Sequence, residues 1–285
     1  MVKDYSVKSL GTVAILGVGL IGGSIGLAIR QRGLSDRVIG IGRKPARLQK
    51  AKQLGAVTET TANIERGVSE ADFVIVCTPV QYVVEHVKQI SQYVRSETLI
   101  TDVGSTKQTI VEGLTGLENG NFVGSHPMAG GDRGGVGNAD ADLFEKRTVV
   151  VTPEKSTNGV AQSGITRFWE SLGARVVELD CKEHDRAVAV ISHLPHTLAS
   201  VLSAQANPKQ LGLAAGGWID TTRIAGADPE LWLEILRDNN KQVIGAVDRF
   251  LDDLHKFRDA LESDNSRVLL RYLNQGKQNR ESMGN

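Results

Sequence analysis

Three glycines near the N-terminus have the spacing that lets a turn of backbone hold a phosphate group. Gly17, Gly19 and Gly22 form a G-x-G-x-x-G pattern between the apolar run 12–16 and a helical run that ends at Ile29. The first glycine permits a tight turn, the second lets the backbone approach a pyrophosphate, and the third lets the helix pack close to the strand. A strand, turn and helix in this order predict a dinucleotide site. The cofactor contacts expected from this turn are Gly17, Gly19, Leu20, Ile21 and Gly22.

The end of the second predicted strand indicates which dinucleotide binds. The run Arg37–Ile41 is followed by Gly42, Arg43 and Lys44, with no Asp or Glu. NAD sites place an acid here for the ribose 2′-hydroxyl, whereas NADP sites place an arginine near the 2′-phosphate. The missing acid and the two cations predict that NADP is preferred and that NAD is the alternative. Further cofactor contacts are expected after two later strands, at Thr78, Pro79 and Val103.

His126 is the residue best suited to proton transfer. It lies in the segment 124–130, which we interpret as a short loop flanked by glycine and proline. Ligands of open α/β sheets bind at the carboxyl ends of the strands, so this imidazole should lie beside the cofactor. An imidazole can accept the proton of a hydroxyl whose C–H delivers a hydride. Ser105 follows another strand and could contact substrate or nicotinamide, or could cap the helix expected near Lys107.

A second group of polar residues lies beyond residue 190. The segment 192–196 reads Ser-His-Leu-Pro-His, and its proline should kink the helix around it. Zinc sites use three protein ligands and no third ligand lies nearby in sequence, so we expect His196 to contact substrate and expect no metal. Gly216 opens a predicted loop in which Arg223 could hold a carboxylate in a bidentate manner. Asp220 would orient that arginine or pair with a histidine.

Short apolar runs alternate with helical stretches over the first part of the chain. The predicted strands are Thr12–Leu16, Arg37–Ile41, Asp72–Cys77, Thr98–Asp102, Asn121–Gly124, Thr148–Thr152 and Ala174–Leu179. The predicted helices are Pro45–Leu54, Tyr82–Tyr93, Lys107–Leu117 and Thr157–Leu172. This alternation predicts an α/β fold with a Rossmann-like, doubly wound and mostly parallel sheet. The later pattern is helical only, so we expect an NADP(H)-binding domain at 1–180 and an all-α domain at 181–285.

The helical part also carries a signal for self-association. His184–Ala206 has apolar residues at helical spacing, and Asp228 followed by proline has the form of a capped helix start. We expect one long helix from there to about Glu262, with an apolar stripe that includes Ile244 and Leu254. A single long helix cannot bury both flanks, so a second copy of the chain is expected to pack against it as a homodimer.

Composition excludes several classes of partner. The 285 residues include 33 basic and 33 acidic side chains without a charged tail, which argues against nucleic acid and anionic membranes. The run 12–29 carries no charge, but its glycine density argues against a membrane span. The two cysteines, Cys77 and Cys181, fit no metal spacing. We therefore expect a cytoplasmic protein with a small-molecule substrate, no nucleic acid and no membrane.

Six segments together resemble the prephenate/arogenate dehydrogenase family of tyrosine biosynthesis. In chain order they are Gly17–Gly22, Cys77–Pro79, Asp102–Lys107, Gly124–Gly130, Ser192–His196 and Asp220–Ala225. The resemblance implies oxidative decarboxylation of a cyclohexadienyl substrate, prephenate or arogenate, with hydride transfer to NAD(P)+. It also implies a Rossmann-like domain followed by a helical dimerisation domain. His126 matches the family's catalytic histidine and Ser105 the serine near it, while His196 and Arg223 match its substrate-binding histidine and carboxylate-binding arginine.

Two other functional classes remain compatible with the sequence. One is another two-domain dehydrogenase of the β-hydroxyacid or imine type, which would usually place a catalytic lysine on the first interdomain helix; the run 184–206 contains none. The other is a non-catalytic NADP-binding sensor, which would need neither His126 nor Arg223. Turnover of a cyclohexadienyl substrate would separate both from the family interpretation.

Overall fold

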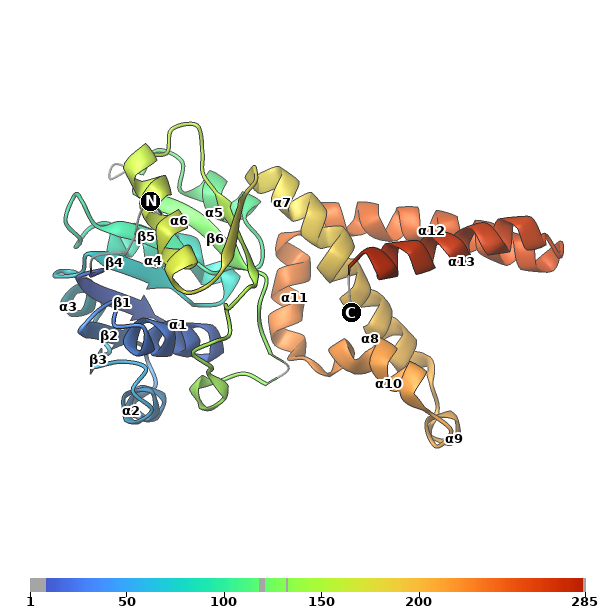
Figure 1. The fold of residues 1–285 in the computed structure, drawn as a ribbon, viewed down its shortest axis with the longest axis horizontal. Coiled ribbons are helices and arrows are strands. Elements are labelled where there is room, and N and C mark those ends of the chain that lie inside the picture. The colour runs from blue at the N-terminus through green and yellow to red at the C-terminus, as the bar shows by residue number, and fades with distance from the viewer. Residues whose placement is uncertain (1–8, 118–120, 132, 284–285) are drawn as a thin grey trace, which may run out of the picture.

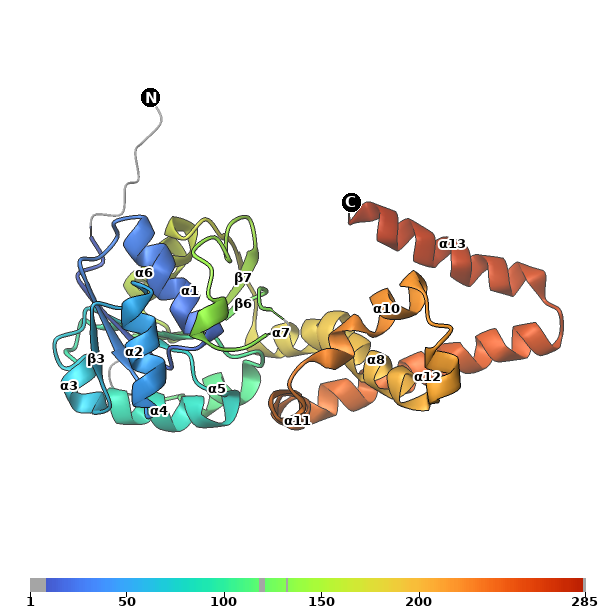
Figure 2. The same cartoon turned by 90° about the horizontal axis from the view of Figure 1, so that it is seen from below.

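The computed structural model describes residues 9–117, 121–131 and 133–283. Residues up to about 180 form an α/β unit, and the remaining helices extend from one side of it (Figure 1). Figure 2 shows the same two parts from below, joined by the helix that begins at Cys181. The α/β unit followed by a helical part is the architecture that the sequence predicts.

A single eight-stranded sheet forms the α/β unit. Its strand order is β3-β2-β1-β4-β5-β6-β7-β8, and every neighbouring pair is parallel except β6 and β7. The strands are β1 (Thr12–Leu16), β2 (Arg37–Ile41), β3 (Glu59–Thr61), β4 (Phe73–Val76), β5 (Leu99–Asp102), β6 (Phe122–Pro127), β7 (Thr148–Thr152) and β8 (Arg175–Glu178). The first six follow the order of a dinucleotide-binding sheet, in which ligands bind where the strand order reverses. β3, an exposed edge strand of polar residues, is the strand that the sequence analysis missed.

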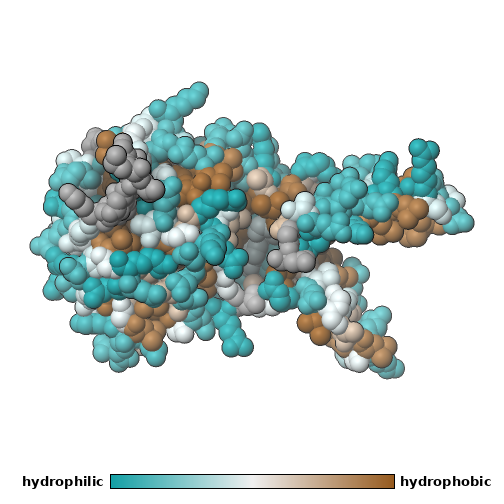
Figure 3. Space-filling model, in the orientation of Figure 1, coloured by the Kyte–Doolittle hydropathy of each residue, from teal (hydrophilic) through white to brown (hydrophobic). Residues whose placement is uncertain are grey.

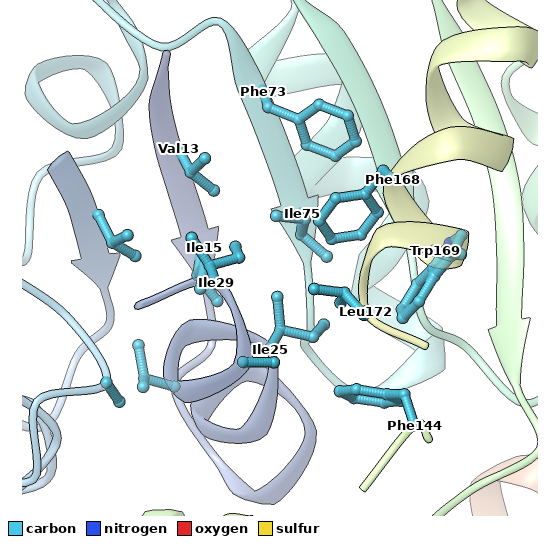
Figure 4. Packing of buried hydrophobic residues seen from close by; sticks show 14 of the residues in the cluster. Val13, Ile15, Ile25, Ile29, Phe73, Ile75, Phe144, Phe168, Trp169 and Leu172 are labelled. Carbon is cyan, nitrogen blue, oxygen red and sulfur yellow. The ribbon is translucent and has the colours of Figure 1, made fainter. Parts of the chain in front are cut away.

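Helices cover both faces of this sheet, as a doubly wound fold requires. They are α1 (Leu20–Gln31), α2 (Pro45–Gln53), α3 (Ile64–Val68), η1 (Val80–Tyr82), α4 (Val83–Ile90), α5 (Gln108–Gly113), η2 (Val136–Asn138) and α6 (Gly159–Ser171). The core under α1, α2 and α6 includes Ile15, Phe73, Phe168 and Trp169, which pack against one another in Figure 4. A second core lies under α3, α4 and α5.

The helical part begins with a nearly continuous helix that changes its winding once. Its elements are α7 (Cys181–Val188), η3 (Ala189–His193), α8 (Leu194–Gln205), α9 (Pro208–Leu211), α10 (Gly216–Thr222), η4 (Arg223–Gly226), α11 (Pro229–Asp238), α12 (Asn240–Glu262) and α13 (Ser266–Ser282). η3 is a π-helical turn just before Pro195, whose ring cannot donate a hydrogen bond and would collide with the carbonyl of Ile191 in a regular α-helix. The proline therefore widens the helix locally.

The prediction of a single long helix from Asp228 to Glu262 is wrong. The chain breaks at Asn239, where φ is −103° and ψ is 24°, and α11 and α12 leave this residue in different directions (Figure 1). Asn239 is buried and its side-chain amide donates to the Asp185 carbonyl at 2.8 Å. A contact with a distant part of the chain, rather than local sequence, thus ends the first helix. The cap at Asp228 is observed as expected, with its side chain accepting from Glu230 N.

The helical part buries few apolar side chains within one chain. Its core cluster contains three buried residues, Ala189, Val243 and Ala246. Of the twenty large apolar side chains that are exposed in the described residues, sixteen lie beyond residue 180. Apolar surface is visible along the α12–α13 pair and around α9 in Figure 3. Ile244 and Leu254 of the expected stripe are 59% and 49% exposed, so this face is open in the single chain.

One stretch of the described residues is long and apolar enough to cross a membrane by length and composition alone. It is Cys181–Gln205, with a mean hydropathy of 1.4. Its polar residues His184 and Asp185 are buried in contacts with the α/β unit. A core helix of a folded protein passes the same test, so the stretch is weak evidence for a membrane span.

Candidate active site

The glycine turn has the geometry that its spacing predicts. Gly17 adopts a φ of +95°, and a Cβ there would lie 2.6 Å from the Cys77 carbonyl oxygen. A Cβ on Gly22 would lie 2.3 Å from the Gly17 oxygen, so this glycine lets α1 pack against the turn. A Cβ on Gly19 would meet nothing within 4 Å. The space in front of Gly19, beside a helix N-terminus that no side chain caps, suits a pyrophosphate.

A cavity of about 360 Å³ opens beside this turn. Among the predicted cofactor contacts, its lining includes Gly17, Gly19, Arg43, Lys44, Thr78 and Pro79. Leu20, Ile21 and Gly22 form the first turn of α1 next to it, and Val103 follows β5 with its N–H bonded to the Val76 carbonyl. No acidic side chain of the described residues lines the cavity. The set fits a dinucleotide and supplies cations where a ribose 2′-phosphate would lie.

Three of the cavity residues that the sequence analysis missed carry polar side chains. They are Arg47 on α2, Tyr82 in η1 and His86 on α4. His86 Nδ1 lies 3.0 Å from the Thr78 hydroxyl oxygen, and burial lowers the pKa of this imidazole below 6.5. Their helices follow the strands that carry the predicted contacts, but nothing in the local sequence marks which helical residues turn toward the cavity.

His126 lies within β6 and not in a loop. His126 pairs with Val150 of the antiparallel strand β7, and this pairing continues to Pro127, where β6 ends. A loop was expected here because nothing in the sequence pattern indicates an antiparallel neighbour for this strand. The side chain still lies at the carboxyl edge of the sheet, as expected. Burial holds the pKa of His126 well below 6.5, and the nearby His184 and Lys107 lower it further. The imidazole is therefore neutral at physiological pH.

His126 is linked to two residues of the helical part that the sequence analysis missed, directly to His184 and through it to Asp185. His126 Nδ1 lies 2.9 Å from His184 Nε2, and His184 Nδ1 lies 2.7 Å from Asp185 Oδ1. Both residues are buried near the start of α7, where Asp180 caps the helix. An adjacent His and Asp among the charged residues of α7 are a weak sequence signal, and His126 lies 58 residues before His184.

Ser105 is not the cap of the helix that follows it. Asp185 takes that position, since its carboxylate accepts from Lys107 N at 2.8 Å and Gln108 N at 3.0 Å. Ser105 lies half-buried in the segment between β5 and α5. The alternative interpretation of Ser105 is therefore wrong, and its expected contact with substrate or nicotinamide stays a prediction.

A buried ion pair lies beneath this segment. Lys107 Nζ donates to the Asp102 carboxylate, and neither side chain is exposed. Asp102 also accepts from Gly104 N at 2.7 Å and Ser125 N at 3.1 Å. Burial lowers the pKa of the Lys107 ammonium, and Asp102 opposes that effect. Because Asp102 ends β5 and Ser125 precedes His126, the pair ties together the two strands that carry the expected catalytic residues.

His196 stacks on an indole ring that the sequence analysis did not single out. The rings of His196 and Trp232 are 3.5 Å apart at their centroids and nearly parallel. His196 Nδ1 is buried without a hydrogen-bond partner in the described structure. Burial lowers the pKa of His196, and it lowers the pKa of the neighbouring His193 to about 4. A buried ring nitrogen without a partner is a free position for a ligand atom.

The last predicted contacts lie on a helix rather than in a loop. Gly216 begins α10, Asp220 lies within it, and Arg223 begins η4. The hydroxyl of Thr221 donates to the Gly217 carbonyl, a pattern that adds a side-chain bond to the helical backbone. Gly216, Asp220 and Arg223 are exposed in the single chain. α10 and η4 both pack against α8, which carries His196, so these residues border the same part of the molecule.

The sheet order, the glycine turn and the neutral histidine at the sheet edge define a dinucleotide-dependent dehydrogenase with a helical second domain. Comparison with known proteins identifies the family. Residues 25–178 match the nucleotide-binding domain of prephenate dehydrogenase and residues 180–275 match its dimerization domain. The chain belongs to the prephenate dehydrogenase family, and its first domain binds NAD(P).

Individual relatives resemble the chain over most of its length. The prephenate dehydrogenase of Bacillus subtilis is 34% identical over 95% of this chain and 76% of its own. The Aquifex aeolicus prephenate dehydrogenase, solved with hydroxyphenyl propionate and NAD+, is 31% identical and superposes with a TM-score of 0.90 over 98% of this chain and 99% of its own. The arogenate dehydrogenase of Synechocystis is 27% identical, with a TM-score of 0.82 over 95% and 99% of the two chains.

Proposed function

We propose that this protein oxidatively decarboxylates prephenate or arogenate with transfer of a hydride to NADP+ or NAD+. The observation that carries the proposal is His126, a neutral, half-buried imidazole at the sheet edge that holds the glycine turn. It lies in a chain that belongs to a family of such dehydrogenases. A neutral imidazole at this place can take the proton of a substrate hydroxyl.

The residues suit the chemistry of a cyclohexadienyl ring. C4 of the ring carries a hydroxyl and a hydrogen, and C1 carries a carboxylate. The hydroxyl proton goes to the imidazole of His126 as the C4 hydrogen leaves as a hydride. The bond from C1 to its carboxylate then breaks, CO₂ leaves, and the electron pair of that bond completes the aromatic ring. The C4 oxygen, now a phenolate, takes back the proton from His126. When bound, the nicotinamide accepts the hydride. Prephenate gives 4-hydroxyphenylpyruvate and arogenate gives tyrosine.

Substrate contacts are proposed from the helical domain. His196 offers a buried ring nitrogen without a protein partner, and Trp232 supports this ring from one face. Arg223 supplies a permanently charged guanidinium that can hold a carboxylate without being neutralised. Gly216 and Asp220 lie on the helix that leads to Arg223. Ser105 is proposed to contact the reacting hydroxyl from the cofactor side.

NADP is proposed as the preferred cofactor. Arg43, Lys44 and Arg47 line the cavity beyond the glycine turn, and no described carboxylate faces them. A 2′-phosphate would gain charge-assisted hydrogen bonds there, whereas the 2′-hydroxyl of NAD would find no carboxylate to accept its hydrogen bond. NAD+ is the cofactor in the solved Aquifex aeolicus relative, and we expect it to bind here more weakly than NADP+.

A cytoplasmic homodimer is the proposed form of the enzyme. The helical domain has a three-residue core and most of the exposed apolar side chains, and it matches the family's dimerization domain. We place the boundary between the domains at residues 180 and 181, since Asp180 caps the helix that opens the second domain. Cys77 and Cys181 are free thiols, which suits a reducing compartment.

The test is turnover of prephenate and of arogenate, each with NADP+ and with NAD+. We expect the wild type to convert at least one substrate and His126→Ala to lower kcat by roughly 10²- to 10⁴-fold with a smaller change in KM. Arg223→Ala should instead raise KM, because a carboxylate loses its partner. Both variants should bind cofactor normally. A wild type that oxidises neither substrate, or a His126→Ala variant with normal turnover, would contradict the proposal.

A further inference from the structure

A chain of two hydrogen bonds connects His126 to a carboxylate of the helical domain. We propose that His184 and Asp185 are positioning residues that fix the tautomer of His126 and leave its Nε2 atom as the proton acceptor. The proposal rests on the proposed function, in which His126 receives the substrate proton. Its geometry is the 2.9 Å contact between His126 Nδ1 and His184 Nε2 and the 2.7 Å contact between His184 Nδ1 and Asp185 Oδ1.

The direction of each hydrogen bond follows from the donors around Asp185. Its two carboxylate oxygens already accept from the backbone N–H groups of Lys107 and Gln108. A carboxylate offers only acceptors, so the atom that meets it, His184 Nδ1, must donate. A neutral imidazole that donates from Nδ1 has a lone pair at Nε2. His126 Nδ1 must then donate to His184, and the free lone pair of His126 is at Nε2.

The surroundings leave this chain little freedom to rearrange. His184 is fully buried, Asp185 is 2% exposed, and the rings of His126 and His184 meet edge to face at 72°. Asn239 donates from its side chain to the Asp185 carbonyl, which holds the backbone of α7 at this point. Burial also makes an unpaired imidazole nitrogen costly, so the pairing resists exchange with water.

Asp185 also orients the other expected catalytic residue. By accepting from Lys107 N and Gln108 N, it fixes the end of the segment that carries Ser105. A single carboxylate of the helical domain therefore fixes the position of the segment that carries Ser105 and the tautomer of His126. Both of these residues belong to the cofactor domain. When His126 takes the substrate proton, its Nδ1–H stays directed at His184, and the Asp185 charge stabilises the positive imidazole pair.

Asp185→Asn tests the proposal, because an amide nitrogen donates where a carboxylate oxygen accepts. Oδ1 of Asp185 accepts from His184 Nδ1 and Lys107 N, and Oδ2 accepts from Gln108 N, so no orientation of the asparagine amide satisfies all three donors. The tautomer of His126 is then no longer fixed, and the positive imidazole pair loses its counter-charge. We expect kcat to fall by roughly 10²- to 10⁴-fold, as when a buried aspartate that orients a catalytic histidine is replaced by asparagine. KM and cofactor affinity should change by less than about threefold.

The matched control is Asp180→Asn, the same substitution at the N-cap of the same helix. Asp180 accepts from Lys182 N and Glu183 N and is not part of the histidine chain. Asparagine caps helices as well as aspartate does, so this variant should keep the wild-type kcat.

Nitrogen-15 spectra of histidine-labelled protein test the tautomer directly, with His126→Ala to assign the signal. We expect the wild-type His126 to carry its proton on Nδ1 and Asp185→Asn to lose this fixed tautomer, so that the form with the proton on Nε2 also appears. The wild-type measurement does not depend on whether Asp185→Asn folds. A wild-type proton on Nε2, or normal kcat in a folded Asp185→Asn, would overturn the positioning chain. Normal kcat in His126→Ala would instead overturn the proposed function.

Discussion

Two glycines, Gly19 at the N-cap of α1 and Gly26 within this helix, should respond differently to the same added methyl group. In Gly26→Ala the new Cβ would lie 2.1 Å from the Ala56 carbonyl oxygen, where ordinary contacts begin near 3.4 Å. The helix and the backbone at Ala56 must therefore separate by roughly 1 Å, and overpacking of this kind costs about 1–3 kcal/mol. Because both sides of the clash are backbone, we expect about 3 kcal/mol, which lowers the melting temperature by roughly 6–12 °C.

Gly19→Ala should leave the fold intact and impair cofactor binding. The added Cβ meets no protein atom within 4 Å, and φ at this residue is −96°, which alanine tolerates. The methyl group instead fills the space where a pyrophosphate must approach the backbone. Loss of one charge-assisted hydrogen bond costs about 1.5–3 kcal/mol, so NADP+ affinity should fall roughly 10- to 150-fold. The melting temperature without cofactor should change by less than about 3 °C.

Differential scanning fluorimetry and a titration followed by NADPH fluorescence separate the two effects. Gly276→Ala is the control, since this glycine lies inside α13 with open space around it and alanine is the better helix former there. The reasoning is refuted if Gly19→Ala binds cofactor like the wild type, or if it loses as much thermal stability as Gly26→Ala.

Three further predictions concern cofactor choice, assembly and pH. Arg43→Ala should weaken NADP+ binding much more than NAD+ binding, and equal losses in two parallel titrations would contradict the NADP preference. Sedimentation analysis at micromolar concentration should find a dimer, and Leu254→Glu on the exposed stripe should shift it toward a monomer; a wild-type monomer would refute the proposed interface. Stability should fall as pH drops below about 6.5, because the unfolded chain then binds protons that buried histidines cannot. For His193, whose pKa is lowered to about 4, the loss by pH 4 is about 3 kcal/mol. Urea unfolding between pH 7.5 and 4 measures it, and His193→Gln should give a shallower dependence; a stability that rises on acidification would contradict the assignment.

Elements with a local apolar signal were predictable from sequence, and those that depend on a distant partner were not. β1 and β2 were predicted with their observed bounds because each is a run of buried residues. β3 is Glu-Thr-Thr, and it is a strand because it pairs with β2. The break at Asn239 has the same origin, since its side chain reaches Asp185 and His193. Neither contact leaves a periodic pattern in the sequence.

The candidate site divides in the same way. The glycine turn and His126 were found because a strand edge, recognisable from sequence, gathers such residues in one place. His184 and Asp185 were missed because they belong to a helix of the other domain, and they meet His126 only after the domains dock. Asp185 also explains why the capping alternative for Ser105 failed. The side chain that caps this helix at Gln108 comes from 77 residues further along the chain and not from the preceding serine.

The small core of the helical domain has a consequence for how the enzyme comes into being. The first domain has two large buried clusters and can fold as it leaves the ribosome, whereas the described residues of the helical domain form one small apolar cluster, built on Ala189, Val243 and Ala246. His184 and Asp185 belong to that later segment. If the proposed homodimer is what stabilises the helical domain, a newly made chain would gain its nucleotide site first and a stably oriented proton acceptor only on meeting a second copy. Activity would then rise faster than in proportion to the amount of protein synthesised and would fade on dilution, while cofactor binding would follow the amount of protein alone.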